Sequence, residues 1–375
     1  MNLPLSFVEI SRENLVHNFS EFRAFVDSRT KIISVVKANA YGHGQSEVAT
    51  ILNDYTDWFQ VDDIEELRLL RRVSQKPVLV AGYVMIPDLE EIVDFKATLL
   101  VYDLERLRAL NQISVQRSLV TKVHLKIDAE LGRQGILLKD LPAFISVAKE
   151  FANVKIEAIC SHFSNIEDTT DFSQAQKQIN DFNRAKHLFE QEGFLGLASH
   201  LSATSGIIAF EKDKGVSDFV RLGIGLYGLY PSQDMQDRFG DKFALKPVMR
   251  WLTHVAQVKD LPAGYPVGYG MTHITERPTQ VALIPQGYSD GYDRGLSNIG
   301  EVLIKEARCR VLGRVAMNMF VVDISGLEVK QEDEVVILGA QGSERISAEE
   351  LADKTSTINY EAVARISPLL KRVVV

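Results

Sequence analysis

The sequence predicts an α/β protein with an N-terminal eight-stranded (β/α) barrel and a mostly-β C-terminal domain. Up to about residue 230, short apolar runs alternate with amphipathic helical stretches, which is typical of a parallel sheet covered by helices. From about residue 245, short strands follow one another between Gly, Pro and Asp turns. Eight strands in about 230 residues favour a barrel, and an open doubly wound sheet is the alternative.

The first domain is expected over residues 1–238. It opens with a helical stretch, "SRENLVHNFSEFRAFV", in which Leu15, Phe19, Phe22 and Val26 share one face. Further amphipathic stretches, such as "DDIEELRLLRRV", separate most of the expected strands. The eight strands are expected at "KIISVV", "WFQV", "KPVLVAG", "ATLLVY", "KVHLKID", "KIEAICSHF", "ASHLSA" and "FVRLGIGLYG".

The second domain is expected over residues 239–375, after the polar and turn-rich joint "YPSQDMQDRFGDK". One helix is expected among its strands, at "SAEELADK", where Ser347 is the N-cap and Glu350 completes a capping box. The strands are expected at "MRWLTHVAQVKDL", "TQVALIPQGY", "EVLIK", "ARCRVLG", "MFVVDIS" and "DEVVILG".

Composition narrows the class of protein. The 375 residues carry a formal net charge of −8 and no basic run, which argues against nucleic-acid binding. The two cysteines, Cys160 and Cys309, suggest reduced thiols and no disulfide framework. The stretch "MNLPLSFVEI" lacks the features of a secretion signal, and no window is apolar enough for a membrane span. We expect a cytoplasmic protein with no membrane association and no metal site.

Polar side chains at the carboxyl ends of barrel strands are the candidate active-site residues, because barrel enzymes place their chemistry there. A strand-end lysine or histidine taken alone is more often structural, but here several would meet at one barrel mouth. The polar residues are Lys37, Lys126, Arg133, His162, Ser205 and Arg221. Gly223 and Ile224, at the exit of the eighth strand, complete the set of candidates.

The loops after the seventh and eighth strands predict a phosphate site. Their sequences, "SATSG" and "RLGIGLYG", contain small residues that allow backbone N–H groups to approach an anion. Lys37 could form a Schiff base with a carbonyl group of the same ligand. Pyridoxal phosphate combines both features. A barrel enzyme that acts on a sugar phosphate through Lys37 is the competing hypothesis.

Ordered motifs across the chain resemble those of the alanine racemase family, which are pyridoxal phosphate enzymes of fold type III. The resemblance runs from residue 33 to about residue 367 and implies the same barrel and β domain. The motifs are "VVKANAYGHG", "HLKIDAELGRQGI", "SHFSNIED", "VRLGIGLYG", "PVGYGMTH", "GRVAMNMFVVD" and "TINYEAVARIS".

The resemblance implies two catalytic bases, Lys37, which also binds the cofactor covalently, and Tyr269. It implies that Arg221 faces the pyridine nitrogen and that His162 bonds to this arginine. The residues expected to hold the cofactor phosphate are Tyr41, Ser205, Gly223, Ile224 and Tyr360. By the same resemblance, His43 is a structural residue of its loop.

Substrate binding is implied for Arg133 and for the backbone of Met317. Lys126 matches a lysine that is often carbamylated in the family and that positions the arginine. The family also implies a homodimer in which the β domain of one subunit completes the active site of the other. The implied reaction is the interconversion of L-alanine and D-alanine, with D-alanine supplied to cell-wall synthesis.

Several positions depart from the family pattern, and they leave the substrate range open. Thr204 replaces an Asn, Gly268 a Ser and Asn318 an Asp, and the pair Ala129–Glu130 replaces Thr–Gly. A serine or broad-specificity racemase on the same scaffold is the first alternative. A non-catalytic pyridoxal phosphate carrier would lack the β domain and Tyr269. A decarboxylase would have a carboxylate in place of Arg221, and an aldolase would need metal ligands.

Overall fold

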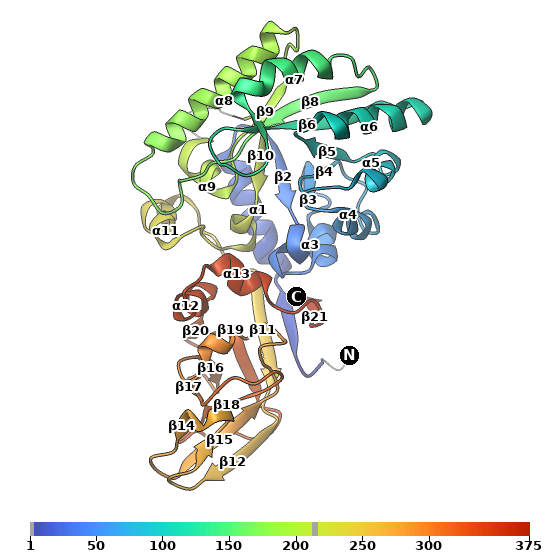
Figure 1. Ribbon diagram of the computed structural model, residues 1–375. Helices are drawn as coiled ribbons and strands as arrows, with labels where there is room; N and C mark the ends of the chain where they lie inside the picture. The colour runs from blue at the N-terminus through green and yellow to red at the C-terminus, as the bar shows by residue number, and fades with distance from the viewer. Residues whose placement is uncertain (1–3, 212–216) are drawn as a thin grey trace. The chain divides into compact units, whose positions relative to one another are not determined.

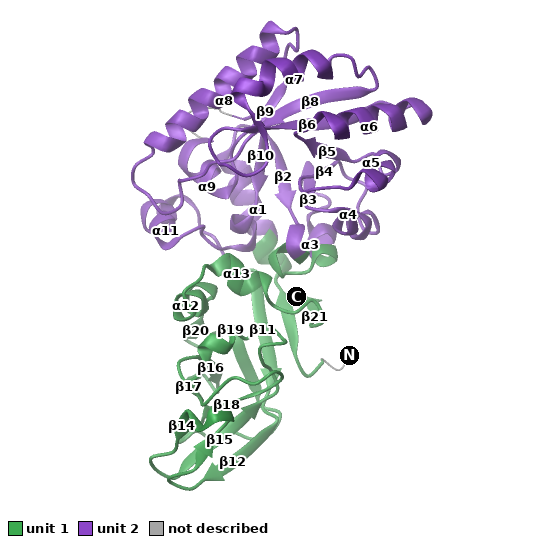
Figure 2. Cartoon of the chain, in the orientation of Figure 1, with its two compact units in different colours: residues 1–15, 39–47, 247–375 green, residues 16–38, 48–246 purple. Residues whose placement is uncertain are grey.

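The computed structural model describes residues 4–211 and 217–375, so the first three residues of the N-terminal stretch lie outside it. The chain forms two compact units (Figure 2). The barrel unit comprises residues 16–38 and 48–246. The β unit comprises residues 1–15, 39–47 and 247–375. Each unit is described below by itself.

The barrel unit contains eight parallel strands in the order β10-β2-β3-β4-β5-β6-β8-β9 (Figure 1). Their bounds are β2 (Lys31–Val35), β3 (Trp58–Val61), β4 (Val78–Val80), β5 (Thr98–Val101), β6 (Thr121–Asp128), β8 (Val154–Cys160), β9 (Ala198–His200) and β10 (Phe219–Leu222). A short strand, β7 (Ile136–Leu137), also pairs with β6. The eight strands are those that the apolar runs predicted.

Two backbone hydrogen bonds join the first and last strands of this order. The N–H of Asp218 donates to the carbonyl of Ser199 at 2.8 Å, and the N–H of Arg221 donates to the carbonyl of Ser202 at 3.0 Å. The sheet is therefore a nearly closed barrel, and the open doubly wound alternative is wrong. Apolar side chains fill its interior, as the layered core of such a barrel requires. They include Ile33, Trp58, Leu79, Leu100, Ala158, Cys160 and Phe219.

Helices alternate with the barrel strands along the chain. Asp63 and Asp103 cap two of them by accepting hydrogen bonds from the N–H groups of Glu66 and Arg106. The helices are α1 (Arg12–Phe25), α3 (Gln45–Leu52), α4 (Ile64–Arg71), α5 (Leu89–Asp94), α6 (Leu104–Gln116), α7 (Leu141–Ala148), α8 (Ser173–Gln191), α9 (Thr204–Gly206) and α11 (Gln233–Phe239). No helix of residues 4–211 and 217–375 has the length and apolar character needed to cross a membrane.

The β unit is built on a mostly antiparallel sheet in the order β12-β15-β18-β17-β16-β19-β11-β1-β21, with β20 paired to β19. The bounds are β1 (Phe7–Ile10), β11 (Met249–His254), β12 (Gln257–Leu261), β15 (Thr279–Ile284), β16 (Glu301–Ile304), β17 (Ala307–Leu312), β18 (Phe320–Asp323), β19 (Glu334–Gln341), β20 (Glu344–Ile346) and β21 (Lys371–Val374). A separate pair joins β13 (Pro266–Val267) and β14 (His273–Ile274). The predicted mostly-β character of this region is confirmed.

Some elements of the β unit were not predicted. Strand β1 comes from the start of the chain and pairs antiparallel with β11 and parallel with β21. A strand of four residues is too short to be recognised by its periodicity. The helix α12 (Ala348–Lys354) has the predicted cap, with Ser347 accepting from the N–H of Glu350. A second helix, α13 (Asn359–Ala364), follows it.

Gly225 allows close packing beside the barrel strand β10. A Cβ atom at this position would lie 2.7 Å from the Phe22 ring and 2.8 Å from the Thr204 methyl group, and both side chains are buried. We expect Gly225→Ala to lower the free energy of unfolding by about 1–3 kcal/mol through overpacking. Urea denaturation measures the change. The control is Gly240→Ala, where the new atom meets only one side-chain atom, at 4.0 Å. Equal stability of the two variants would contradict the prediction.

Candidate active site

Lys37 lies where the chain leaves strand β2, as the strand-end rule predicted. Its amine is 3.6 Å from the carboxylate of Asp62, which follows β3. The carboxylate of Glu66 accepts from the N–H of Ala38 at 2.6 Å and from the N–H of Asp62 at 2.7 Å. Burial raises the pKa of Glu66 above its ordinary value. Glu66 therefore ties the ends of β2 and β3 together around Lys37.

A left-handed turn follows Lys37. All four residues from 38 to 41 have φ between 50° and 54°, and Gly42 continues at 82°. L-residues in this conformation cost roughly 1–2 kcal/mol each. A Cβ atom on Gly42 would lie 2.0 Å from the carbonyl oxygen of Val363 in α13, so close backbone packing holds the end of the turn. Such strain is typical of functional sites.

Tyr41 at the end of this turn lies beside Tyr360 of α13. Their ring centroids are 6.1 Å apart, with an interplanar angle of 50°. The structure thus brings together two of the residues predicted to hold a phosphate, although 318 residues lie between them in the sequence. Both tyrosines belong to the β unit.

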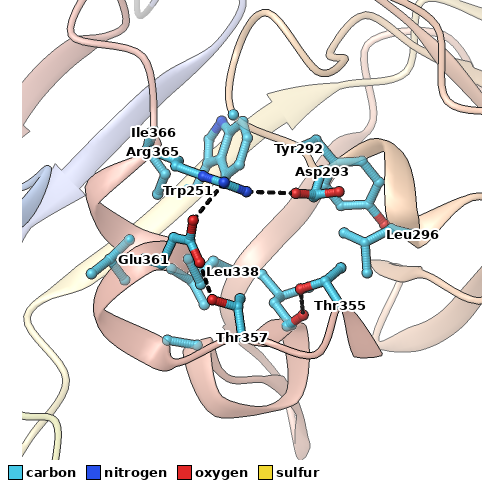
Figure 3. Close-up of a pocket in the computed structure, with 15 residues that line it drawn as sticks. Trp251, Tyr292, Asp293, Leu296, Leu338, Thr355, Thr357, Glu361, Arg365 and Ile366 are labelled. Atoms are coloured by element: carbon cyan, nitrogen blue, oxygen red, sulfur yellow. Dashed lines mark hydrogen bonds and ion pairs between the residues drawn. The ribbon is translucent and has the colours of Figure 1, made fainter. Parts of the chain in front are cut away.

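An ion-pair network anchors the helix that carries Tyr360. Figure 3 shows it among the residues that line a pocket beside Trp251. The guanidinium of Arg365 contacts the carboxylate of Asp293 at 2.9 Å and that of Glu361 at 2.5 Å. The hydroxyl of Thr357 donates to Glu361 as well. These contacts fix α13 from both ends and so orient the face that bears Tyr360.

His43 is structural, as expected. It is buried, and its Nδ1 lies 3.1 Å from the carbonyl of Ala40 and 3.0 Å from that of Tyr41, so this nitrogen donates. Burial lowers the pKa of His43 to about 4, which keeps the ring neutral. The guanidinium of Arg372 donates to the carbonyl of Gly42 at 2.6 Å. Both side chains stabilise the loop after the left-handed turn.

Arg221 of β10 is the centre of the polar network in the barrel. It is buried, and its guanidinium donates to the carbonyl oxygens of Ser161 at 2.8 Å and Leu201 at 3.0 Å. It also contacts Nδ1 of His200 at 2.5 Å and Nδ1 of His162 at 3.2 Å. Because arginine has no acceptor, both imidazole nitrogens must accept. The predicted bond between His162 and Arg221 is present.

Several of the predicted barrel residues lie close enough to act on one another. Burial, followed by the positive charge of Arg221, lowers the pKa of His162 well below its ordinary value. Lys126, Arg133 and Lys37 add to this effect with their own charges. A neutral imidazole among basic side chains is the result, so the barrel mouth favours anionic ligands.

Lys126 of β6 is buried beside this cluster. Burial lowers its pKa to about 7, and the charges of Arg221 and Arg133 act in the same direction. Cys160, its neighbour on β8, opposes the shift and does so more strongly than either arginine promotes it. The amine is therefore largely neutral just above pH 7, the state in which a lysine is a nucleophile.

The turn after β10 and the short helix α9 pack tightly against each other. The hydroxyl oxygen of Thr204 accepts from the N–H of Gly223 at 3.0 Å and from that of Gly225 at 3.3 Å. The N–H of Gly223, a predicted phosphate ligand, is thus engaged by the side chain that departs from the family pattern. Ser205 and Ile224, the other predicted ligands of this turn, are buried next to it.

Tyr269 and Met317 belong to the β unit, and both side chains are exposed. Tyr269 begins the short turn η6 (Tyr269–Met271) and is 73% exposed, whereas Met317 is 54% exposed. Gly268 and Gly270 flank the tyrosine with φ of 70° and 72°, values that favour glycine. The glycine that replaces a serine at position 268 therefore suits its backbone.

Asn318 has a defined role beside Met317. Its amide nitrogen donates to the hydroxyl of Ser289 at 2.8 Å. That hydroxyl donates in turn to the carbonyl of Met317 at 2.8 Å, and the Ser289 N–H contacts the same oxygen at 3.0 Å. An ionised aspartate at position 318 could not donate. Asn318 thus holds the backbone of Met317 through Ser289.

Three residues of the barrel network escaped the sequence analysis. They are His200 of β9, His124 of β6 and Glu157 of β8. His124 could have been noticed, because it lies two residues before Lys126 and side chains alternate along a strand. Among the described residues, no group of three His, Cys, Asp or Glu side chains is arranged to hold a metal ion.

A barrel with a lysine, a buried arginine and phosphate-suited turns at its strand ends, joined to a β unit, defines an enzyme of the (β/α) barrel class. Comparison with known families narrows this class. A family model described as "Alanine racemase, N-terminal domain" matches residues 10–231, and "Alanine racemase, C-terminal domain" matches residues 248–374. The chain belongs to the alanine racemase family, which consists of isomerases.

Individual relatives match over nearly the full chain. Alanine racemase 1 of Caldanaerobacter subterraneus is 37% identical over 373 residues, 98% of this chain and 94% of that protein. The alanine racemase of Halothermothrix orenii is 35% identical over 370 residues, 98% and 96% of the two chains. The solved alanine racemase of Bacillus anthracis with bound L-Ala-P is 29% identical, with a TM-score of 0.93 over 100% of this chain and 96% of its own.

A solved alanine racemase of Bartonella henselae is described with covalently bound pyridoxal phosphate. It is 26% identical, with a TM-score of 0.87 over 100% of both chains. The residues of the present barrel fit this cofactor, which needs an amine for its aldehyde and a close backbone approach for its phosphate. Lys37 offers the amine. A Cβ atom on Gly206 would lie 2.9 Å from the Cβ of Ser202, so the turn beside Ser205 tolerates no larger residue.

The low pKa of Lys126 predicts a pH-dependent stability. Between pH 7 and the ordinary value of 10.5, the amine is neutral in the folded protein and protonated in the unfolded chain. Unfolding therefore takes up a proton, and the free energy of unfolding should rise with pH over this range. Lys126→Met removes the effect and should stabilise the protein at pH 7 by several kcal/mol, at about 1.4 kcal/mol per pKa unit.

Urea denaturation at pH 7, 8 and 9 in buffer free of carbon dioxide measures this dependence. The control is Lys155→Met, which changes an exposed lysine of strand β8. It should keep the slope of the unchanged protein. A slope that Lys126→Met leaves in place would show that this amine is not the titrating group.

Proposed function

We propose that this protein interconverts L-alanine and D-alanine with pyridoxal phosphate as its cofactor. The observation that carries the proposal is the buried guanidinium of Arg221 in strand β10, held by two imidazoles and three backbone carbonyl oxygens. Membership of the alanine racemase family supports the substrate.

Pyridoxal phosphate, when bound, supplies a ring that withdraws electrons and so acidifies the α-proton of an amino acid. We assign its covalent attachment to Lys37. Arg221 would face the ring nitrogen and, having no acceptor and no accessible neutral form, would leave that nitrogen unprotonated. Arg221 thereby limits how far charge spreads into the ring, which disfavours protonation at the wrong carbon and hence transamination.

Inversion requires a proton to leave one face of the α-carbon and another to arrive on the opposite face. Lys37 and Tyr269 would serve the two faces, since one fixed base cannot reach both. Each side chain alternates between holding the proton and releasing it, at the amine nitrogen of Lys37 and at the phenolic oxygen of Tyr269.

The remaining site residues bind the substrate carboxylate and hold its ligands in place. Arg133 and the backbone of Met317 would receive the substrate carboxylate. Lys126, whose neutral amine can react with carbon dioxide, would as a carbamate become an anion that holds Arg133 in place. Unmodified and protonated, the same lysine would repel that arginine.

The residues that would hold the cofactor phosphate are Ser205, Gly223, Ile224, Tyr41 and Tyr360. Thr204 already accepts from the N–H of Gly223, so this donor would be shared with the phosphate or exchanged. The Tyr360 phenol would also limit the room for substrate side chains and so favour alanine.

The exposure of Tyr269 supports a homodimer with shared active sites. A catalytic base must lie in a site that excludes water, yet this side chain is 73% exposed in the single chain. The segments around it and around Met317 expose further large apolar side chains, as interfaces between subunits do before assembly. They are Tyr265, Met271, Ile274, Tyr288 and Met319. The β unit of one subunit would then complete the barrel site of the other.

A serine or broad-specificity racemase is the second candidate, because Asn318 and Thr204 depart from the family pattern. In either case the product is a D-amino acid, and D-alanine would be supplied to cell-wall synthesis.

Racemisation in D₂O tests the proposal. Purified protein with pyridoxal phosphate should invert L-alanine and place deuterium at its α-carbon, and should act on L-serine more slowly. Tyr269→Phe should reduce inversion by about 10²–10⁴-fold, since it removes one base. Exchange without inversion should persist for only one enantiomer, served by Lys37. The control Tyr265→Phe changes a neighbouring exposed tyrosine and should keep the rate. No exchange with either substrate would overturn the proposal.

Mixing two inactive variants tests the shared site. Lys37→Ala and Tyr269→Phe subunits should each be inactive, whereas hybrid dimers would contain one site with both bases intact. Random reassortment should restore roughly a quarter of the original activity. If both bases came from one chain, no mixture could regain activity. Racemisation assays before and after subunit exchange distinguish the two arrangements.

A further inference from the structure

A line of polar side chains continues from Arg221 into the barrel, away from the groups assigned to the reaction. Nδ1 of His200 meets the arginine at 2.5 Å, and Nε2 of His200 lies 2.9 Å from Nδ1 of His124. Nε2 of His124 is 3.6 Å from Oε2 of Glu157, whose other oxygen accepts from the amine of Lys122 at 2.8 Å. Four contacts thus link five side chains of four strands.

A β-bulge places Glu157 in this line. Val123 of β6 pairs with Ile156 of β8, but the next residue, His124, pairs with Ala158. Glu157 is the extra residue that has no partner in the ladder. Bulges change the direction of a side chain and are frequent near active sites. Here the bulge directs a carboxylate towards His124.

The two histidines are sealed from water. Both are 0% exposed, and the rings of Trp58 and Phe219 pack against His124 with centroid distances of 5.7 Å and 5.5 Å. Within the described residues, Nε2 of His124 and Oε2 of Glu157 have no hydrogen-bond partner, and they face each other at 3.6 Å, just beyond hydrogen-bond distance. A buried donor or acceptor without a partner destabilises the folded protein by about 1–3 kcal/mol. A proton on Nε2 of His124 that points at Oε2 of Glu157 reduces this cost for both atoms.

The donors in this line must all point the same way. Arg221 can only donate, so Nδ1 of His200 accepts and its proton lies on Nε2. That proton is donated to Nδ1 of His124, whose own proton then lies on Nε2 and faces Glu157. A carboxylate can only accept, so each end of the line requires the same pair of tautomers.

The charges agree with this order. Burial lowers the pKa of His200 and of His124, so both rings are neutral near pH 7. The facing N–H of His124 lowers the pKa of Glu157 to about 2, so the carboxylate is ionised. A cation and an anion therefore lie at opposite ends of two neutral imidazoles whose dipoles are aligned.

We propose that Glu157 and His124 are positioning residues that fix the tautomer of His200 and thereby the guanidinium of Arg221. Without the carboxylate, His124 is free to carry its proton on Nδ1, which would face the Nε2 proton of His200. Relief of that conflict moves the His200 proton to Nδ1, where it opposes Arg221. The consequence for catalysis rests on the function proposed above, whereas the order of protons does not.

Histidine tautomers provide the first test. Long-range ¹H–¹⁵N spectra of the ¹⁵N-histidine-labelled holoenzyme should show both His200 and His124 protonated at Nε2 alone. Glu157→Met should give mixed tautomers at both rings. Glu157→Gln keeps an acceptor at nearly the same place and should restore the single tautomer. Lys122→Met is the matched control, because it removes the ion pair of Glu157 but leaves the line from Arg221 intact.

Racemisation rates provide the second test. Glu157→Met should lower kcat by roughly tenfold, a typical consequence of removing a hydrogen bond to a charged network. Glu157→Gln and Lys122→Met should stay within about threefold of the unchanged protein. In an Arg221→Lys background, Glu157→Met should have little further effect, because it acts through the arginine.

The outcomes separate the two proposals. A protein that shows the ordered tautomers but racemises neither alanine nor serine would refute the proposed function and support the line of positioning residues. An Nδ1 proton on His200 in the unchanged protein would overturn the positioning proposal. So would a Glu157→Met variant that retains both the tautomers and the rate.

Discussion

The polar network inside the barrel depends on one buried permanent cation, the guanidinium of Arg221. A guanidinium cannot give up its proton in a protein, so every group packed around Arg221 must accept. The backbone carbonyls of Ser161 and Leu201 do so, directly after β8 and β9. The imidazoles of His162 and His200 accept as well, and burial, followed by the charge of Arg221, lowers their pKa values. Burial is the main cause of the lowered pKa values of these histidines and of Lys126, and the charge of Arg221 acts in the same direction.

The β unit depends on a different constraint, the left-handed turn after Lys37. Four L-residues in succession with positive φ cost several kcal/mol, at roughly 1–2 kcal/mol each, and other contacts must offset this cost. One such contact is the close packing of Gly42 against the backbone of α13. Another is the hydrogen bond that the Arg372 guanidinium donates to the Gly42 carbonyl. The small side chains that follow the lysine in sequence are thus explained by backbone conformation as much as by space for a ligand.

Sequence alone predicted the elements that have a strong local pattern. The eight barrel strands were evident from apolar runs, and Lys37 and Arg221 from their positions at strand ends. Strand β1 was missed because four residues show no periodicity. Glu157 was missed for a deeper reason. A bulge between two strands depends on their pairing, which no single strand records, so the side that Glu157 faces could not be read from its own segment.

The two departures nearest the expected ligands bear on the substrate. Thr204 replaces an asparagine, yet its hydroxyl oxygen accepts from two N–H groups of the glycine turn. Asn318 replaces an aspartate, yet its amide holds Ser289, which in turn holds the Met317 carbonyl. Each of the two side chains therefore forms hydrogen bonds with neighbouring residues of the chain. Neither change requires a hydroxyl on the substrate, so both departures are compatible with alanine, and the serine alternative rests on them only as differences from the family pattern.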